Sequence, residues 1–331
     1  MKTAKPKNLS KSKYLKGLQC PRLLWVDDND RSRIEYDEST QFVMTQGQEV
    51  GLLAQTLFSG GLDAASDNYR ENLAKTRQLL ARRQPIFEAG LTADSLYCRV
   101  DILRPAGDDE WDIIEVKSTN SVKREHLDDL AFQRRCAALA GLNINRCFLL
   151  HLDRDYVKEG SIDPAELFII EDVTEDMEEH AAGLDERIDE MLEVLSSPCS
   201  PEAIIGAHCS SPHECPLMAE CWADLPPHHP MTLYYGKALG EKLLLQGITH
   251  LADMPPGTKL NGKQQIQCAA IAADQPHIDA AAISSFLEQL EYPLYFMDFE
   301  TFQTAVPLYN GTSPYQQIPF QFSVHLVDSP G

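Results

Sequence analysis

The sequence predicts an α/β fold, and three features in its first half indicate it. A charged amphipathic stretch at residues 70–83 is typical of a helix. Residues 97–118 contain two β-rich runs joined by a polar turn, which is typical of a hairpin. A helical stretch at 122–140 ends at a glycine and is followed by an apolar strand at 146–152. Strands that alternate with helices in this way are typical of a sheet covered by helices.

The hairpin carries the residues with the most chemistry. On its second strand Ile113, Glu115 and Lys117 share one face, because strand side chains alternate. Asp101 lies in the first strand, so the hairpin brings it beside that face. Two carboxylates can hold Mg²⁺ or Mn²⁺, and the metal can activate water and neutralise a phosphate. The lysine can orient that water or stabilise developing charge. The pattern indicates metal-dependent phosphodiester hydrolysis, although such residues also occur on solvated strand faces.

This pattern resembles the PD-(D/E)xK nuclease core, here Asp101 followed by Glu115-Val116-Lys117. The resemblance implies a restriction-endonuclease-like fold in which Asp101 and Glu115 are metal ligands. It also implies the carbonyl of Val116 as a further ligand and Lys117 as the catalytic lysine. RecB-like nucleases place a glutamine on the helix after the hairpin, which implies a catalytic role for Gln133.

An earlier helical stretch at residues 40–58 departs from that family pattern. RecB-like nucleases commonly carry a metal-binding histidine here, a few residues after a glycine. Counted from Gly47, the histidine position falls at about Gly51. Glu49 is the nearby residue that offers an oxygen ligand instead.

Composition bounds the partners and the compartment. The chain has 331 residues, 43% of them hydrophobic, and a net charge of −21, which argues against coating nucleic acid by bulk charge. Residues 1–35 hold nine Lys or Arg against four Asp or Glu, so a basic arm is available for phosphates. Residues 171–193 are strongly acidic, and we expect one long helix at about 174–195. No apolar run is long enough for a bilayer and no secretion signal is evident, so we expect a cytoplasmic protein without a membrane partner.

A second constellation consists of cysteines. Cys209, Cys215 and Cys221 follow one another at intervals of six in an irregular, proline-rich stretch. Cys20 is the natural fourth ligand, since Cys-Pro recurs at Cys20 and Cys215. Thiolates of this kind bind an iron–sulfur cluster or, as the alternative, Zn²⁺. Buried thiols without a metal are the remaining interpretation.

One early cysteine and three late ones resemble the iron–sulfur RecB-like nucleases, which include the CRISPR-associated exonucleases. That resemblance covers about residues 9–222 and implies a 4Fe-4S cluster that joins the two ends of a nuclease domain over residues 1–225. The six-residue steps are more even than is usual in that group.

The remainder predicts a linker and small helical segment at 226–290, with two short helices broken at Gly247. Within 291–331, Asp298 and Glu300 end an apolar strand and point to one face. This resembles the start of a DEDD exonuclease of the RNase H-like fold. Because the sequence stops at Gly331, we expect an incomplete domain in which these two carboxylates form an orphaned half-site. The whole chain resembles uncharacterised bacterial proteins that join the two parts.

The function expected from these patterns is that of a divalent-metal-dependent nuclease with a structural iron–sulfur cluster, acting in DNA repair, recombination or defence. DNA is the expected substrate rather than RNA. Two alternatives are a non-catalytic nucleic-acid-binding module and a zinc-stabilised interaction protein. Metal-dependent DNA cleavage distinguishes the first interpretation from both.

Overall fold

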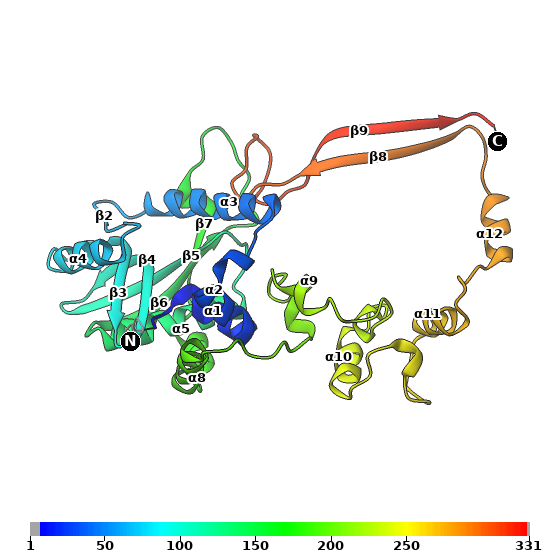
Figure 1. Cartoon of the computed structure of the whole chain (residues 1–331). Coiled ribbons are helices and arrows are strands. Elements are labelled where there is room, and N and C mark those ends of the chain that lie inside the picture. The colour runs from blue at the N-terminus through cyan, green and yellow to red at the C-terminus, as the bar shows by residue number, and fades with distance from the viewer. Residues whose placement is uncertain (1–6, 330–331) are drawn as a thin grey trace. The chain divides into compact units, whose positions relative to one another are not determined.

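The computed structural model describes residues 7–329, and the chain divides into two compact units. Unit 1 comprises Met1–Glu202 and Gln303–Gln317, and unit 2 comprises Ala203–Phe302 and Ile318–Gly331. Figure 1 shows the elements of both. None of the helices within residues 7–329 combines the length and the apolar character needed to cross a membrane.

Unit 1 contains the sheet and most of the helices. Its strands are β1 Leu9–Ser10, β2 Leu62–Asp63, β3 Ile86–Ala93, β4 Leu96–Ala106, β5 Glu110–Lys117, β6 Asn143–Leu152 and β7 Phe168–Asp172. Its helices are α1 Lys11–Gln19, α2 Pro21–Asn29, the 3-10 turn η1 Arg31–Arg33, α3 Glu38–Gln55, α4 Tyr69–Leu80, α5 Arg124–Leu139, α6 Pro164–Leu167, α7 Thr174–His180 and α8 Leu184–Ser196.

These strands form one seven-stranded mixed sheet. Its order is β2-β3-β4-β5-β6-β7, and β1 pairs in parallel with β4. The pairs β3–β4, β4–β5 and β6–β7 are antiparallel, whereas β5–β6 is parallel, with α5 as its crossover. The predicted α/β class and the predicted hairpin, β4–β5, are therefore confirmed.

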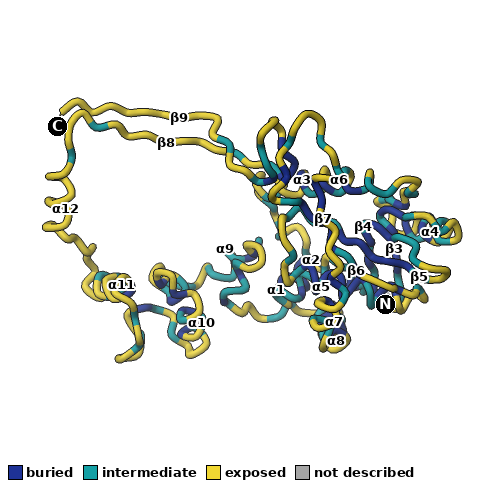
Figure 2. Tube along the Cα trace, turned by 180° about the vertical axis from the view of Figure 1, so that it is seen from behind, coloured by how far each residue is buried: buried dark blue, intermediate teal, exposed yellow. Residues whose placement is uncertain are grey.

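Helices cover both faces of this sheet. On one face, α1, α2, α5, α7 and α8 pack against alternate strand residues such as Ile113 and Leu149. On the other face, α3 packs through Val50 and Ala54 against Ile102 and other strand residues. Figure 1 shows the sheet between α3 and the α1–α5 layer, and Figure 2 shows that its central strands are the most buried part of unit 1. Burial of apolar residues on both faces is the main source of stability.

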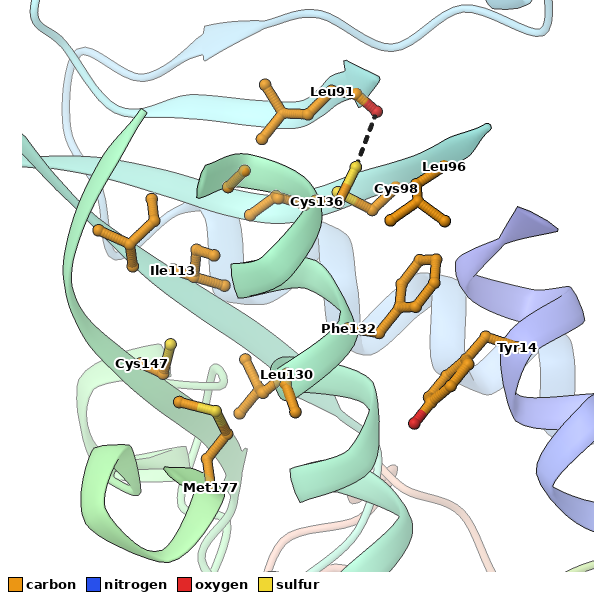
Figure 3. Close-up of a cluster of buried hydrophobic side chains, with 14 of the residues drawn as sticks. Tyr14, Leu91, Leu96, Cys98, Ile113, Leu130, Phe132, Cys136, Cys147 and Met177 are labelled. Carbon is orange, nitrogen blue, oxygen red and sulfur yellow. Dashed lines mark hydrogen bonds between the residues drawn. The ribbon is translucent and has the colours of Figure 1, made fainter. Parts of the chain in front are cut away.

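The core beneath α5 is tightly packed. The rings of Tyr14 and Phe132 stack with centroids 4.7 Å apart, which joins α1 to α5. Cys136, also on α5, places its Sγ 3.5 Å from the carbonyl oxygen of Leu91 in β3 (Figure 3). The same close-up shows Cys98 of β4 beside Cys136. These contacts hold α5 against β3 and against β4, the first strand of the hairpin.

The prediction of one long acidic helix is wrong. The acidic stretch forms two helices, α7 and α8, because Gly183 adopts a left-handed conformation (φ +71°) that interrupts them. The first helix, α1, continues through Gly17 to Gln19, since Gly17 is buried close to Met191 of α8. A Cβ at Gly17 would lie 2.6 Å from the Met191 sulfur, so close packing explains this glycine.

The segment 303–317 belongs to unit 1, although it comes after most of unit 2 in the sequence. Ala305 and Val306 are buried against α3, and the Ala305 amide donates a hydrogen bond to the Gln46 side chain. Tyr315 donates its hydroxyl to the carbonyl oxygen of Ser118, just after β5.

Unit 2 consists of short helices and one hairpin. Its elements are η2 Ala207–Ser210, α9 Met218–Cys221, η3 Pro230–Thr232, α10 Lys237–Leu245, η4 Leu251–Asp253, α11 Gly262–Ala273, α12 Ala280–Leu287, β8 Leu294–Phe302 and β9 Ile318–Val327. Leu233, Leu243 and Leu251 are buried within it. The β8–β9 hairpin and α12 are exposed along almost their whole length (Figure 2).

Candidate active site

Glu115 is the centre of a buried polar cluster on β5. Its side chain is 2% exposed and accepts hydrogen bonds from Lys117 (Nζ–Oε1 2.6 Å) and Gln133 (Nε2–Oε2 2.7 Å). Strand alternation places Ile114 and Val116 on the α3 face, which leaves Glu115 and Lys117 on the α5 face as the sequence predicts. The structure therefore brings together three of the residues selected from the sequence.

Asp101 joins this cluster because β4 and β5 separate at this point. Their ladder runs from Ala106–Glu110 to Ile102–Ile114, which places Asp101 opposite Glu115 in register. Past the last pair, the Asp101 carboxylate takes the place of a backbone acceptor, and its Oδ2 accepts the Val116 N–H at 2.8 Å. The separation of the strands thus opens the sheet where the carboxylates lie.

The alternation of faces in β3 and β4 breaks beside Asp101. In β3, Glu88 adopts a left-handed conformation with φ +54°, and it stands opposite Asp101 between two ladder pairs. In a regular strand, residues two apart share a face. Here Val100 and Leu103, which are three apart, both pack into the core beneath α5. Irregularities of this kind re-aim side chains next to functional sites, and a left-handed non-glycine residue costs about 1 kcal/mol or more. Glu88 is also bound to Arg99 (Nε–Oε2 3.0 Å).

Two residues of the cluster were not selected from the sequence. Asp129, fully buried on α5, accepts from Lys117 at 2.7 Å and from Gln133 at 2.9 Å. Asp129 precedes Gln133 by four residues, so the helical period was a signal that could have found it. Lys11, the first residue of α1, places its ammonium 2.9 and 3.0 Å from the two Glu115 oxygens. No local pattern marks Lys11.

The charges in the cluster depend strongly on one another. Burial raises the pKa of Asp101 to about 7, and the Glu115 carboxylate adds to that rise. Burial and the Glu115 charge likewise raise the pKa of Asp129. Burial acts the same way on Glu115, but the ammonium groups of Lys11 and Lys117 outweigh it and lower the Glu115 pKa. Glu115 is therefore the most acidic of the three carboxylates.

Both lysines remain charged. Burial lowers the pKa of Lys117, yet the Asp129 and Glu115 carboxylates raise it further, and the net change is a rise. The same balance raises the pKa of Lys11. Hydrogen bonds between ionised partners are the strong ones, so we expect this cluster to be rigid.

A cleft of about 920 Å³ opens beside the cluster. Asp101, Glu115 and Lys117 line it together with residues of α3. Gly47 and Gly51 form part of its α3 wall, and a Cβ built at Gly51 would have no atom within 4 Å. The position where the family pattern has a histidine thus borders the cleft. Glu49 is exposed on α3 and is not among the residues that line the cleft.

The predicted cysteine ligands fall in both units. Cys20 caps α2 in unit 1, whereas Cys209, Cys215 and Cys221 lie in unit 2. Cys209 and Cys215 are buried and are close in the backbone, since the Cys215 amide donates to the Cys209 carbonyl at 2.8 Å. The four-cysteine cluster remains a prediction.

The second half-site lies in unit 2. Asp298 and Glu300 are exposed on β8 and pair in register with Ser323 and Gln321 of β9. Asp298 accepts a hydrogen bond from the following amide at 3.0 Å.

Carboxylate side chains of the kind in this cluster suit a divalent cation, but within residues 7–329 no group of three or more His, Cys, Asp or Glu side chains has the geometry of a formed metal site. Asp101, Glu115 and Asp129 all lie within 3.8 Å of the Lys11 ammonium, so the cluster already surrounds a positive charge. Carboxylate oxygens are the ligands that Mg²⁺ and Mn²⁺ prefer.

Fold and site together define a mixed α/β protein with a buried carboxylate–lysine cluster beside an open cleft. A family model described as a domain of unknown function, DUF2779, matches residues 295–331. No curated protein matches the chain.

Several solved structures are distantly similar. A crystal structure of SSO0001 has a TM-score of 0.33 at 12% identity, covering 59% of this chain and 80% of that one. An alkaline exonuclease, LHK-Exo, from Laribacter hongkongensis has a TM-score of 0.31 at 11% identity, covering 58% of this chain and 93% of that one. LHK-Exo in complex with dAMP has a TM-score of 0.30 at 13% identity, with 56% and 91% covered.

Proposed function

We propose that this protein is a divalent-metal-dependent nuclease that hydrolyses DNA, with a RecB-like catalytic core in unit 1. The observation that carries the proposal is the convergence of Asp101, Glu115 and Lys117 where β4 and β5 separate, next to an open cleft. Two carboxylates and an ammonium at a sheet edge are the groups that metal-dependent phosphodiester hydrolysis needs.

Asp101 and Glu115, with the carbonyl of Val116, would hold Mg²⁺ or Mn²⁺. The metal would supply an activated water and positive charge against the phosphate. Lys117 uses two of its three donors on Glu115 and Asp129, which leaves one for a phosphate oxygen or the attacking water. Gln133 donates to the same two carboxylates, so it holds both in position.

Further parts of the proposal concern the rest of the chain. Cys20, Cys209, Cys215 and Cys221 would bind a 4Fe-4S cluster, with Zn²⁺ as the alternative. Asp298 and Glu300 would take no part in cleavage. The family resemblance supports a role in DNA repair, recombination or defence, and the cytoplasm is the compartment expected from the sequence.

Cleavage assays with a matched pair of variants test the catalytic assignment. Asp101→Asn keeps the shape of the side chain but removes the charged ligand, and we expect Mg²⁺- or Mn²⁺-dependent cleavage of end-labelled DNA to fall at least about a hundredfold. Asp94→Asn is the control, because Asp94 lies in the β3–β4 turn with φ +52°, a conformation that asparagine tolerates. Equal cleavage by the Asp101 variant and wild type would show that the site is assigned wrongly. Single-stranded and duplex DNA and RNA of one sequence would define the substrate.

One observation favours a second function, nucleic-acid binding without cleavage. Gly51 offers no ligand to the cleft at the position where the family pattern has a histidine. A chain that shifts DNA in a gel but leaves it uncut with either metal would support this alternative.

A further inference from the structure

Lys11 reaches the cluster through a long-range strand pair. Leu9 and Ser10 form β1, which pairs in parallel with Leu96 and Tyr97 of β4. The Ser10 hydroxyl then caps α1 by accepting the Lys13 amide at 3.3 Å, so the helix begins at Lys11. This places the Lys11 side chain in the space that opens where β5 leaves β4.

The acceptor sites of Glu115 are filled. A carboxylate has about four lone-pair sites, two on each oxygen. Oε1 accepts from Lys11 and Lys117, and Oε2 accepts from Lys11 and Gln133. A metal ligated by Glu115 therefore has to displace one of these donors.

Among the three donors, Lys11 is held least firmly. Lys117 and Gln133 are each bound to a second carboxylate, Asp129, at 2.7 and 2.9 Å. The other carboxylate neighbours of Lys11, Asp101 and Asp129, lie at 3.8 Å, which exceeds hydrogen-bond distance. The Lys11 side chain is also 21% exposed, so it can leave without unfolding its surroundings.

We propose that the Lys11 ammonium occupies the divalent-cation position among Asp101, Glu115 and Asp129, and that the cation displaces it on binding. This inference rests on the proposed metal-dependent function. With all three carboxylates ionised, as cation binding requires, and with two ammonium groups, the cluster has a formal charge of −1. Exchange of Lys11 for a divalent cation gives a formal charge of zero, so the exchange improves the balance of charge in a buried site.

A place for the displaced side chain exists next to the cluster. A second cleft of about 440 Å³ is lined by Lys11 itself, by Arg99 and by three carboxylates, which are those of Asp67, Glu88 and Asp101. The released ammonium enters this cleft, where the Asp67 and Glu88 carboxylates offer it new partners.

The test measures metal affinity rather than activity. The whole chain, freed of metal with a chelator, is titrated with Mn²⁺ by calorimetry in four forms, which are wild type, Lys11→Met, Lys13→Met and Asp101→Asn. Lys11→Met keeps the aliphatic stem and removes the competitor, so we expect Mn²⁺ to bind about tenfold to a hundredfold more tightly. Lys13 is the matched control, because it lies on α1 like Lys11 but pairs with Asp28 of α2 at 2.5 Å. The Lys13→Met variant should therefore bind Mn²⁺ as wild type does.

The outcomes separate this inference from the proposed function. Equal or weaker Mn²⁺ binding by Lys11→Met overturns the inference, whereas wild-type binding that is lost in Asp101→Asn leaves the proposed metal site standing. If only Lys11→Met binds Mn²⁺, the result supports competition between the Lys11 ammonium and the cation. If none of the chains binds Mn²⁺, both ideas are wrong.

A measurement on the wild type covers the case in which Lys11→Met does not fold. An amine-reactive reagent followed by mass spectrometry should label Lys11 several-fold faster in saturating Mn²⁺, while Lys13 keeps its rate. Unchanged labelling of Lys11 while Mn²⁺ binds would mean that ammonium and cation share the carboxylates, which contradicts displacement.

Discussion

At the scale of single residues, the site depends on an unequal division of charge among three carboxylates. Glu115 stays ionised because two lysines bind it directly. The Asp101 carboxylate accepts a hydrogen bond from one backbone N–H, and its Oδ1 lies 3.8 Å from the Lys11 ammonium, so burial dominates its pKa. Asp101 is consequently the carboxylate that titrates near neutral pH.

This division predicts a pH dependence of stability in metal-free protein. The folded-state pKa of Asp101, about 7, exceeds the unfolded value near 4, so the folded state binds the Asp101 proton more tightly. Its contribution to stability is then complete below about pH 4 and is lost as the pH rises toward 7. Asp101→Asn should remove this loss and raise the free energy of unfolding at pH 7.5, relative to wild type, by on the order of 2 kcal/mol.

Urea unfolding at pH 5 and pH 7.5 in the presence of a chelator measures that difference. At pH 5 the two proteins should lie closer together than at pH 7.5. A constant gap at both pH values would contradict the assigned titration of Asp101.

At the scale of elements, local patterns explain the hairpin but not its distortion. The period-two pattern of β5 and the polar turn before it predict two paired strands, and the structure confirms them. Apolar residues alternate in β4 from Leu96 to Ile102, however, and this pattern gives no sign of the break at Asp101. That break depends on the left-handed Glu88 backbone, which a buried side chain on α4 supports.

The supporting side chain is Asn72. Its Nδ2 donates at 2.8 Å to the carbonyl oxygens of Ala64 and Glu88, and its Oδ1 accepts from the Tyr97 hydroxyl at 2.9 Å. Gly90 of β3 leaves room for it, since a Cβ there would lie 1.7 Å from the Asn72 Oδ1. Asn72 thus holds α4 on the sheet and fixes the strand next to the cleft.

Gly90→Ala should therefore destabilise unit 1 by about 2–4 kcal/mol, because Asn72 must move and leave buried polar groups unpaired. Gly51→Ala is a matched control on α3, where the added methyl meets no atom within 4 Å and the helix should gain about 0.5–1 kcal/mol. Thermal unfolding followed by circular dichroism compares the two. Similar melting temperatures for both variants would show that Asn72 is not held as described.

At the scale of the whole molecule, contacts between distant parts of the chain decide what a single sequence can reveal. Asp101, Glu115, Lys117 and Gln133 are close in sequence and follow strand and helix periods, so they could be selected together. Lys11 could not be selected from the sequence, because only the pairing of the two-residue strand β1 with β4 brings it to the site. The segment 303–317 could not be assigned to unit 1 for the same reason, since Gln46 and Ser118 are its partners.

The four-cysteine prediction also depends on distant parts of the chain. Cys215→Ala should abolish the iron content and the visible absorption at roughly 400 nm of anaerobically purified protein, because thiolate ligation of iron gives that colour. Cys199 is exposed and lies outside the predicted set, so Cys199→Ala should keep both. Metal analysis and absorption spectra provide the measurement. A colourless chain with stoichiometric zinc would replace the cluster by a zinc site, and a folded chain without metal would contradict both.

Cys20 is the predicted ligand that lies far from the other three in the sequence. Cys209, Cys215 and Cys221 are close in sequence within unit 2, whereas Cys20 belongs to unit 1. Ligation by Cys20 would close a very long loop and so stabilise the folded chain. Cys20→Ala should then lose iron as completely as Cys215→Ala does, and its thermal unfolding should shift to lower temperature. Full iron retention in Cys20→Ala would place the fourth ligand elsewhere.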